Sequence, residues 1–259
     1  MSQEQIIVTV PPQGLSTLRG RAVTPGHLAY RLGRGSRLLR ADAPPLHGGL
    51  MVVGLGEEQT PAQPDRFCQE VVRECFARGF SGVMLDFEAR TPQLERLANR
   101  LDRQLTARRL SLLVPEAYGM AAPRAGVVVS SALSGGTLTG RVQEVQQQFG
   151  ADRVVLGLEK SAEDFLLPSP SGCGTPISQE ELQGLLDRLR PCVFFSAPLC
   201  ARYFTYMGDK GSAHFVLFDD GDTMLRKLEV GRDMGVSRFV LPWTELEACL
   251  PIDGLRSRR

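Results

Sequence analysis

Short, continuous apolar runs alternate with longer amphipathic segments along most of this chain, and this rhythm constrains the fold more than any other feature. Most of the runs lack hydrophobic/polar alternation, which is typical of strands covered on both faces in a parallel sheet. The runs span 6–10, 49–55, 82–88, 110–115, 126–131, 153–159 and 237–243, and a further strand is expected near 36–41. Strands that alternate with helices predict an α/β fold with right-handed crossovers.

Amphipathic helices are predicted between these strands, over 64–78, 92–105, 141–149, 178–189 and 222–234. Thr91 followed by Pro92 is typical of an N-cap and a first helical position. The run from Ser178 to Glu181 has the spacing of a capping box. These start signals fix where two of the helices are expected to begin.

The chain has 259 residues, a length that α/β barrels reach as one domain. With about eight strands, the pattern favours a single (β/α)8 TIM barrel over 1–259, and a doubly wound sheet is the alternative. Two expected strands, 202–207 and 213–219, break the rhythm. They predict a small β-hairpin insertion, about 201–219, before the last helix and strand.

The charges nearly cancel, with 30 Lys and Arg against 29 Asp and Glu and a net charge of +1. This balance argues against a nucleic-acid or acidic-membrane partner. No apolar run approaches the roughly 18 residues of a spanning helix, and the start of the chain lacks the basic region of a signal peptide. The six cysteines show no C-x-x-C spacing and the three histidines are scattered, so we expect reduced thiols and no metal or cofactor.

The run 82–88 carries two acids near its end. Because side chains alternate along a strand, Asp86 and Glu88 share a face with Gly82 and Met84. Two acids on a buried face are costly unless they are used or paired. Active sites of barrels lie at the C-terminal ends of the strands. The pair is therefore a candidate site, and capping of the next helix or pairing with a nearby arginine is the alternative.

This run resembles the fourth-strand signature of glycoside hydrolase family 18, the chitinase-like barrels, which reads D-G-x-D-x-D-x-E after an aromatic residue. The matching residues are Phe80, Gly82, Asp86 and Glu88, and Ser81 and Met84 replace the first two aspartates. The segment 149–158 is similar to the entry of the family's seventh strand. The segment 214–243 is similar to its C-terminal part, which ends in a tryptophan. Residues 1–48 match no motif of the family.

The resemblance implies retaining, substrate-assisted hydrolysis of β-linked N-acetylglucosamine polymers, either chitin-like or peptidoglycan. It assigns the acid/base to Glu88, the orienting partner to Asp86 and the floor of the sugar subsite to Trp243. A catalytic acid needs a raised pKa, which the charge of Asp86 is expected to supply to Glu88. If the site binds sugar, these three residues converge on one open pocket. With no signal peptide, we expect a cytoplasmic or spore-associated protein, since the family includes a spore-associated branch.

Met84 and Ser131 depart from the family pattern. A thioether cannot take the charge that the second aspartate receives, and loss of one electrostatic partner costs on the order of 100- to 1000-fold in rate. Ser131 stands about where active members have a tyrosine that holds the acetamido oxygen. Apart from the resemblance, Tyr118 is our candidate for that role. Glu116 and Glu159 are candidate substrate-binding acids, with a solvated surface position as the alternative.

Three functions therefore stay open. The retained Glu88 favours a hydrolase, whereas Met84 and Ser131 favour a catalytically impaired or inactive sugar-binding barrel, or a structural or assembly barrel such as a spore protein. None of the histidines, His214 included, shows a local serine or cysteine arrangement, so a catalytic triad is not predicted.

Overall fold

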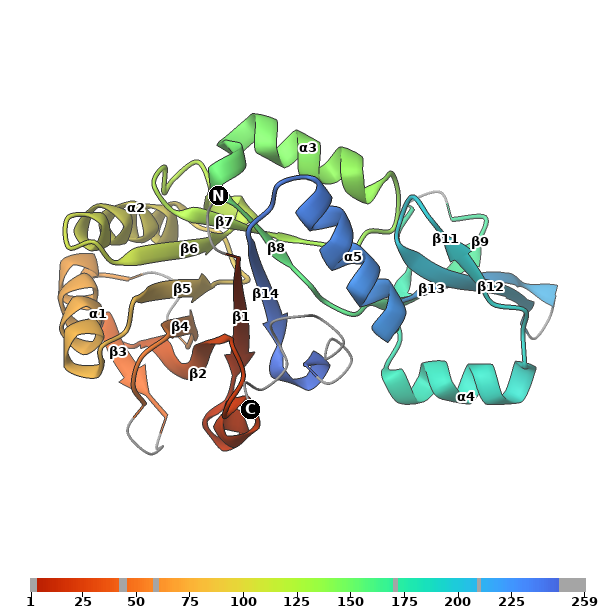
Figure 1. Ribbon diagram of the computed structural model, residues 1–259, viewed down its shortest axis with the longest axis horizontal. Helices are drawn as coiled ribbons and strands as arrows, with labels where there is room; N and C mark the ends of the chain where they lie inside the picture. Colours follow the sequence, from red (N-terminus) through yellow and green to blue (C-terminus); the bar gives the residue numbers. More distant parts are fainter. Residues whose placement is uncertain (1–3, 42–45, 58–60, 170–171, 209–210, 247–259) are drawn as a thin grey trace.

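The computed structural model describes residues 4–41, 46–57, 61–169, 172–208 and 211–246. Eight parallel strands form a closed barrel, because β1 pairs with both β14 and β2 (Figure 1). In order around the barrel they are β1 (Gln5–Val10), β2 (Thr24–Gly33), β4 (Leu50–Leu55), β5 (Gly82–Asp86), β6 (Ser111–Pro115), β7 (Gly126–Ser130), β8 (Val154–Gly157) and β14 (Arg238–Pro242). The predicted TIM-like barrel is confirmed, and the acidic run lies on its fourth strand. The start of the chain was the basis for expecting no signal peptide, and its residues 1–3 lie outside the described residues.

The second barrel strand is not the one that the sequence predicts. β2 spans Thr24–Gly33, and the expected strand at 36–41 is β3 (Arg37–Arg40), which pairs antiparallel with β2 outside the barrel. β2 mixes polar and apolar residues, and its register against β4 shifts between Leu28 and Tyr30. No continuous apolar run marks it, so the sequence pattern missed it.

The barrel is covered by α1 (Pro64–Arg78), α2 (Pro92–Thr106), α3 (Leu138–Phe149) and α5 (Gly221–Asp233). Proline occupies the first turn of α1 and of α2, and the Thr91 side chain accepts a hydrogen bond from the backbone of Leu94. After β1, β2 and β6 the chain forms the short 3-10 helices η1 (Pro12–Leu18) and η2 (Glu116–Tyr118) and the strand β3 in place of an α-helix. The helical layer is therefore incomplete. Among the described residues, no helix is long and apolar enough to span a membrane.

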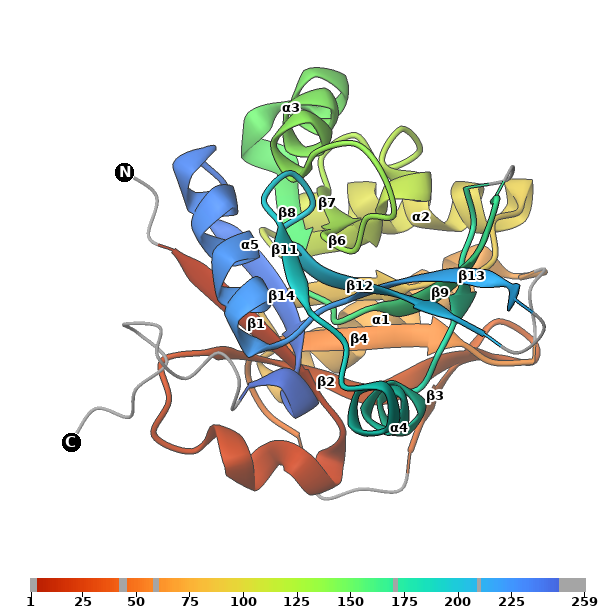
Figure 2. The ribbon, with the colours of Figure 1, turned by 90° about the vertical axis from the view of Figure 1, so that its right-hand side faces the viewer.

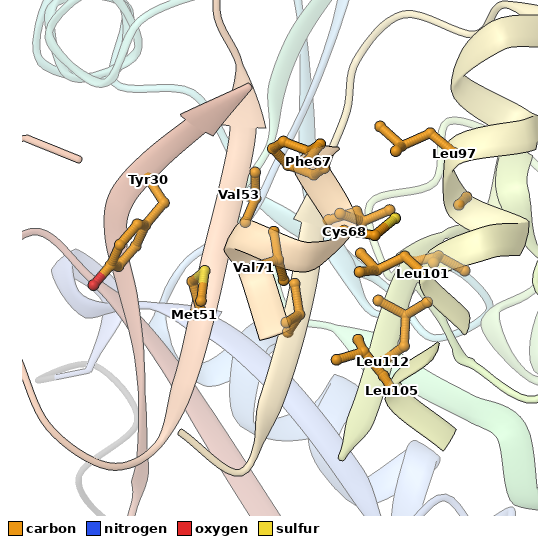
Figure 3. Packing of buried hydrophobic residues seen from close by; sticks show 14 of the residues in the cluster. Tyr30, Met51, Val53, Phe67, Cys68, Val71, Leu97, Leu101, Leu105 and Leu112 are labelled. Atoms are coloured by element: carbon orange, nitrogen blue, oxygen red, sulfur yellow. The ribbon is translucent and has the colours of Figure 1, made fainter. Parts of the chain in front are cut away.

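Two apolar shells follow from the alternation of side chains along the barrel strands. The interior shell consists of Ile7, Leu50, Val52, Met84, Leu113, Val155 and Val240. Outside the barrel, α1 and α2 pack on the strands through residues such as Phe67, Cys68 and Leu101 (Figure 3). Cys68 and Cys75 are both buried there, whereas Cys173 and Cys192 are exposed.

A five-stranded antiparallel sheet and one helix are inserted between β8 and α5 (Figures 1 and 2). Its elements are β9 (Ala162–Leu167), β10 (Thr175–Pro176), α4 (Gln179–Leu189), β11 (Phe194–Ser196), β12 (Ala201–Met207) and β13 (Ala213–Phe218). The hairpin predicted at 201–219 is the β12–β13 pair. The insertion is larger than predicted, because it starts at β9, and the helix predicted at 178–189 belongs to it rather than to the barrel. Ser178 and Glu181 form the expected capping box.

A buried ion pair fixes both ends of this insertion to α5. The Nζ of Lys227 lies 2.7 Å from Oδ1 of Asp219, and both side chains are at most 1% exposed. Thr223 donates to Oδ1 of Asp219 at 2.9 Å. The backbone N–H and the hydroxyl of Ser161 donate to its Oδ2 at 3.1 and 3.0 Å. Because Ser161 precedes β9 and Asp219 follows β13, one carboxylate holds the first and last strands together.

Candidate active site

The acidic pair lies at the mouth of the barrel, at the end of β5. Met84 points into the barrel interior, whereas Val83, Leu85 and Phe87 pack in the outer shell. Because side chains alternate, Asp86 continues the inward-facing row of Met84 beyond the packed interior. Asp86 and Glu88 are both exposed there. The sequence argument expected a buried face, but the acids lie above the apolar interior and keep access to water.

Asp86 and Glu88 line one open pocket of about 560 Å³. Its other lining residues are Leu28, Ala29, Tyr30, Arg31, Leu39, Arg40, Ala41, Val52, Gly54 and Leu55. The pKa of the Asp86 carboxyl is raised, first because the pocket removes part of its hydration and second because of the charge of Glu88. The two acids therefore interact electrostatically. Among the described residues neither forms an ion pair, and α2 is capped by Thr91 instead.

Arg31, Gly54 and Asp86 form one row across three neighbouring strands. Arg31 is the register partner of Gly54, and Gly54 is the register partner of Asp86. A Cβ atom on Gly54 would meet nothing closer than the Asp86 carbonyl oxygen at 3.9 Å, so the space above this glycine is open. The row places a cation and an anion on opposite sides of an open gap.

Most of the pocket wall comes from β2, β3 and β4, and the sequence analysis assigned no functional residue there. Arg31 and Arg40 carry positive charge into this wall, and Leu28 and Leu39 are exposed apolar side chains, 38% and 50% accessible. These residues lie in the first 48, which match no family motif. The one sequence signal that could have identified this wall is the hydrophobic pattern of β2. The bulge between Leu28 and Tyr30 obscures that pattern.

Trp243 lies outside this pocket. It is half-buried, at the start of the 3-10 helix η5 (Trp243–Glu245), and packs on the outer shell of the barrel. A Cβ atom on Gly14 of η1 would lie 3.2 Å from its ring, so the indole packs on the β1–η1 segment. Val240 faces the interior and Leu241 the outer shell, so the alternation of β14 directs Trp243 outward as well. Of the three residues whose convergence the sugar hypothesis requires, only Glu88 and Asp86 line this pocket. This result counts against a sugar site floored by Trp243.

Tyr118 and Glu116 are also remote from the pocket lining. Tyr118 is fully buried in the outer shell, and its hydroxyl donates to the carbonyl of Ala89, the residue after Glu88. Glu116 forms an ion pair with Arg141 on α3. β6 ends at Pro115, and the turn of η2 carries both side chains away from the barrel interior. Tyr118 therefore contacts the loop that follows the acidic pair rather than the pocket itself.

Glu159 lies at the end of β8 and is exposed. It accepts a hydrogen bond from the hydroxyl of Ser130 on β7 at 3.2 Å. Ser131, which the family resemblance pairs with a tyrosine, is buried, and its hydroxyl has no hydrogen-bond partner among the described residues. Glu159 does not line the pocket that contains Asp86 and Glu88.

The chemistry that this arrangement supports is acid/base chemistry by two carboxylates in an open, partly apolar pocket. Coupled carboxylates tend to share one proton, which one of them can then donate. In the described part of the chain, no cluster of three or more His, Cys, Asp or Glu side chains has the geometry to hold a metal ion.

Comparisons with known proteins identify the fold. No protein-family model matches the sequence, and no curated protein does. A chitinase from Chromobacterium violaceum has 15% identity and a TM-score of 0.67, over 96% of this chain and 100% of that one. The spore cortex-lytic enzyme SleL of Bacillus cereus has 14% identity and a TM-score of 0.66, over 95% of this chain and 74% of that one.

A GH18 chitinase from Cycas revoluta, solved in complex with (GlcNAc)4, is also similar. It has 13% identity and a TM-score of 0.60, over 93% of this chain and 95% of the other. These identities are too low to carry an activity over, but the coverage includes nearly the whole barrel. The chain has the barrel fold that is shared by GH18 chitinases and spore cortex-lytic enzymes.

Proposed function

We propose that this protein is a family 18-type glycosidase that cleaves β-linked N-acetylglucosamine polymers by substrate-assisted, retaining hydrolysis. The observation that supports it most is the exposed Asp86–Glu88 pair, which lines one open pocket at the end of the fourth barrel strand. In this proposal Glu88 protonates the leaving oxygen and later activates water. Asp86 orients the acetamido group, whose carbonyl oxygen attacks the anomeric carbon.

The two carboxyls of the pair act on each other, because partial burial and the charge of Glu88 raise the pKa of Asp86. The raised pKa is that of Asp86, to which this proposal gives the orienting role. A general acid needs one proton to give, and after transfer the pair has the charge to deprotonate water. Met84 fills the interior below with a thioether and supplies no further charge, so we expect slow turnover.

Peptidoglycan fragments are the favoured substrate within this class. Arg31 faces Asp86 across Gly54, and its charge suits a substrate with carboxylates. Muramyl and peptide groups of peptidoglycan carry carboxylates, whereas chitin is neutral. The similarity to spore cortex-lytic enzymes is consistent with such a substrate and with a spore-associated setting.

A sugar-binding barrel without catalysis is the second candidate. Met84 in place of an acid favours it, because turnover would use that acid. The outward packing of Trp243 removes a sugar contact from both candidates and does not separate them. In this case the pocket binds the saccharide, but bond cleavage does not follow.

One experiment separates these functions. Wild type, Glu88→Gln and Glu229→Gln are each incubated with chitotetraose and with purified muropeptides, and products and binding are measured. Glu229 is an exposed acid on α5 that serves as the matched control. Cleavage by wild type and Glu229→Gln, but not by Glu88→Gln, supports the hydrolase. Binding without cleavage supports the second candidate, and the absence of both at millimolar ligand overturns both and leaves a structural role.

A further inference from the structure

One buried hydroxyl from the loop after β6 holds the backbone that directly follows Glu88. Tyr118 on η2 donates this hydrogen bond to the carbonyl of Ala89, which lies 29 residues earlier in the sequence. The Tyr118 ring packs edge-on against Phe87, at 5.9 Å between centroids and 75° between ring planes. Tyr118 therefore contacts the residues on both sides of Glu88, although the two segments follow different strands of the barrel.

The segment that carries Tyr118 is itself well anchored. Arg153, which directly precedes β8, donates to three carbonyl oxygens of this segment at 2.8 to 2.9 Å, those of Gly119, Ala122 and Ala125. Asn99 on α2 donates to the carbonyl of Ala121 at 2.8 Å. The phenol thus projects from a segment that is bonded to α2 and to the start of β8.

The position of the Glu88 carboxylate depends on its backbone. Glu88 is exposed, and among the described residues its carboxylate has no hydrogen bond or ion pair. The preceding residue, Phe87, is buried in the outer shell. The backbone is therefore fixed before Glu88 by packing and after Glu88 by the bond from Tyr118.

The hydroxyl of Tyr118 is not explained by core packing alone. The side chain is fully buried, and a buried hydroxyl is costly unless it is hydrogen-bonded. A phenylalanine would fill the same place without that cost. Removal of water from the phenol raises the pKa of Tyr118 to about 12, so the hydroxyl remains a donor across the neutral range.

We propose that Tyr118 is a positioning residue, which holds Glu88 at a fixed distance from Asp86 through the carbonyl of Ala89. A misplacement of about 1 Å in a reacting group can cost on the order of 100-fold in rate. The interaction between two charges likewise weakens as their separation grows. The effect on turnover rests on the proposed glycosidase function, whereas the fixed geometry of the pair does not.

Titration of Asp86, followed by NMR of the carboxyl carbons in the full chain, tests this geometry. Glu88→Gln removes the neighbouring charge, so we expect the pKa of Asp86 to fall. In a Tyr118→Phe background that fall should be smaller, because a mobile Glu88 spends less time near Asp86. Arg31 and Arg40, the other charged residues of the pocket, are present in every variant, so their effect cancels in the comparison.

A split between the kinetic constants separates positioning from a purely structural role. On muropeptides, Tyr118→Phe should lower kcat roughly ten-fold, the equivalent of one hydrogen bond, and leave KM unchanged. Tyr206→Phe is the matched control. Its hydroxyl donates to Asp164 in the inserted sheet at 2.8 Å, and Tyr206 does not line the pocket. This variant should leave kcat, KM and the titration of Asp86 unchanged.

An equal fall in the pKa of Asp86 with and without the Tyr118 hydroxyl overturns the proposal. A rise in KM alone also overturns it, because that result indicates contact with the substrate. If Tyr118→Phe fails to fold, NMR relaxation of the wild-type backbone decides: an order parameter of about 0.85 at Ala89 supports a fixed loop, and one below about 0.6 overturns it. Absence of cleavage by wild type overturns the glycosidase proposal alone, and the titration then decides the role of Tyr118.

Discussion

Arg31 and Asp86 lie on one row of the barrel mouth, with only the side-chain-free Gly54 between them. Two strand spacings separate their backbones by roughly 10 Å, which leaves the charges free to contact a ligand rather than each other. We expect Arg31→Gln to weaken binding of carboxylate-bearing muropeptides roughly ten-fold, as loss of one charged hydrogen bond does. Binding of neutral chitotetraose should stay unchanged, as measured by isothermal titration calorimetry.

Arg34 provides the matched control for this prediction. It lies beyond the end of β2 and forms an exposed ion pair with Glu57, so Arg34→Gln should leave both affinities unchanged. Equal weakening for the neutral and the charged saccharide in Arg31→Gln would mean that Arg31 does not select for carboxylates.

The raised pKa of Asp86 predicts a pH dependence of stability. The folded state holds the Asp86 proton more tightly than the unfolded state, so the free energy of unfolding decreases as pH rises from the ordinary carboxyl pKa of 3.8 through the raised value. Asp86→Asn removes this loss. Urea unfolding should therefore show the variant to be more stable than wild type at neutral pH and equal to it below the ordinary pKa.

The charge of Glu88 supplies part of that effect, so the gain from Asp86→Asn should be smaller in a Glu88→Gln background. An Asp86→Asn variant that is less stable than wild type at neutral pH would contradict the raised pKa.

The ion pair between Lys227 and Asp219 should dominate the stability of the joint between barrel and insertion. Lys227→Met leaves a buried carboxylate without its cation, which costs about 3–5 kcal/mol in the free energy of unfolding. Chemical denaturation measures this loss. The neighbouring Arg226→Met removes an exposed ion pair with Glu229 and should cost less than about 1 kcal/mol. Similar losses in the two variants would show that burial of the pair does not matter.

Trp243 tests the sugar-floor role that the family resemblance implies. Its packing on the outer shell predicts that Trp243→Ala lowers stability by roughly 2 kcal/mol and leaves the Kd for saccharide unchanged. Leu15→Ala, in η1 on the same shell, is a control for the loss of packing alone. A large loss of saccharide binding in Trp243→Ala, with none in Leu15→Ala, would instead support the sugar-floor role.

The parts of the fold that depend on side-chain alternation and helix signals could be predicted from sequence. The continuous run at β5 gave the correct faces for Met84 and Asp86, and the proline and cap residues marked the start of α2. The same alternation, applied from Val240 and Leu241, places Trp243 on the outer face, so the sequence pattern itself argued against the sugar-floor role. The sequence pattern does not reveal the bulge in β2. For that reason the sequence analysis missed the part of the pocket wall that carries Arg31.

The contacts between distant segments could not be read from the sequence either. His214 contacts Asp164 only because β9 lies beside β13. Tyr118 is turned outward by the short helix η2 that follows β6. In both cases the local pattern was correct, but the position of the side chain was decided by a neighbour that the pattern does not contain.

The carboxylate of Asp219 has a consequence for how this barrel diversifies. Because the backbone N–H and the hydroxyl of Ser161 are hydrogen-bonded to Asp219, the chain leaves and re-enters the barrel at a single point. The inserted sheet therefore behaves as a cassette: its length and content can change through duplication, deletion or grafting without altering the spacing of β8 and α5. A chimaera that receives this cassette needs only one junction to be rebuilt. The contacts to restore there are those of Asp219 with Ser161 and Lys227.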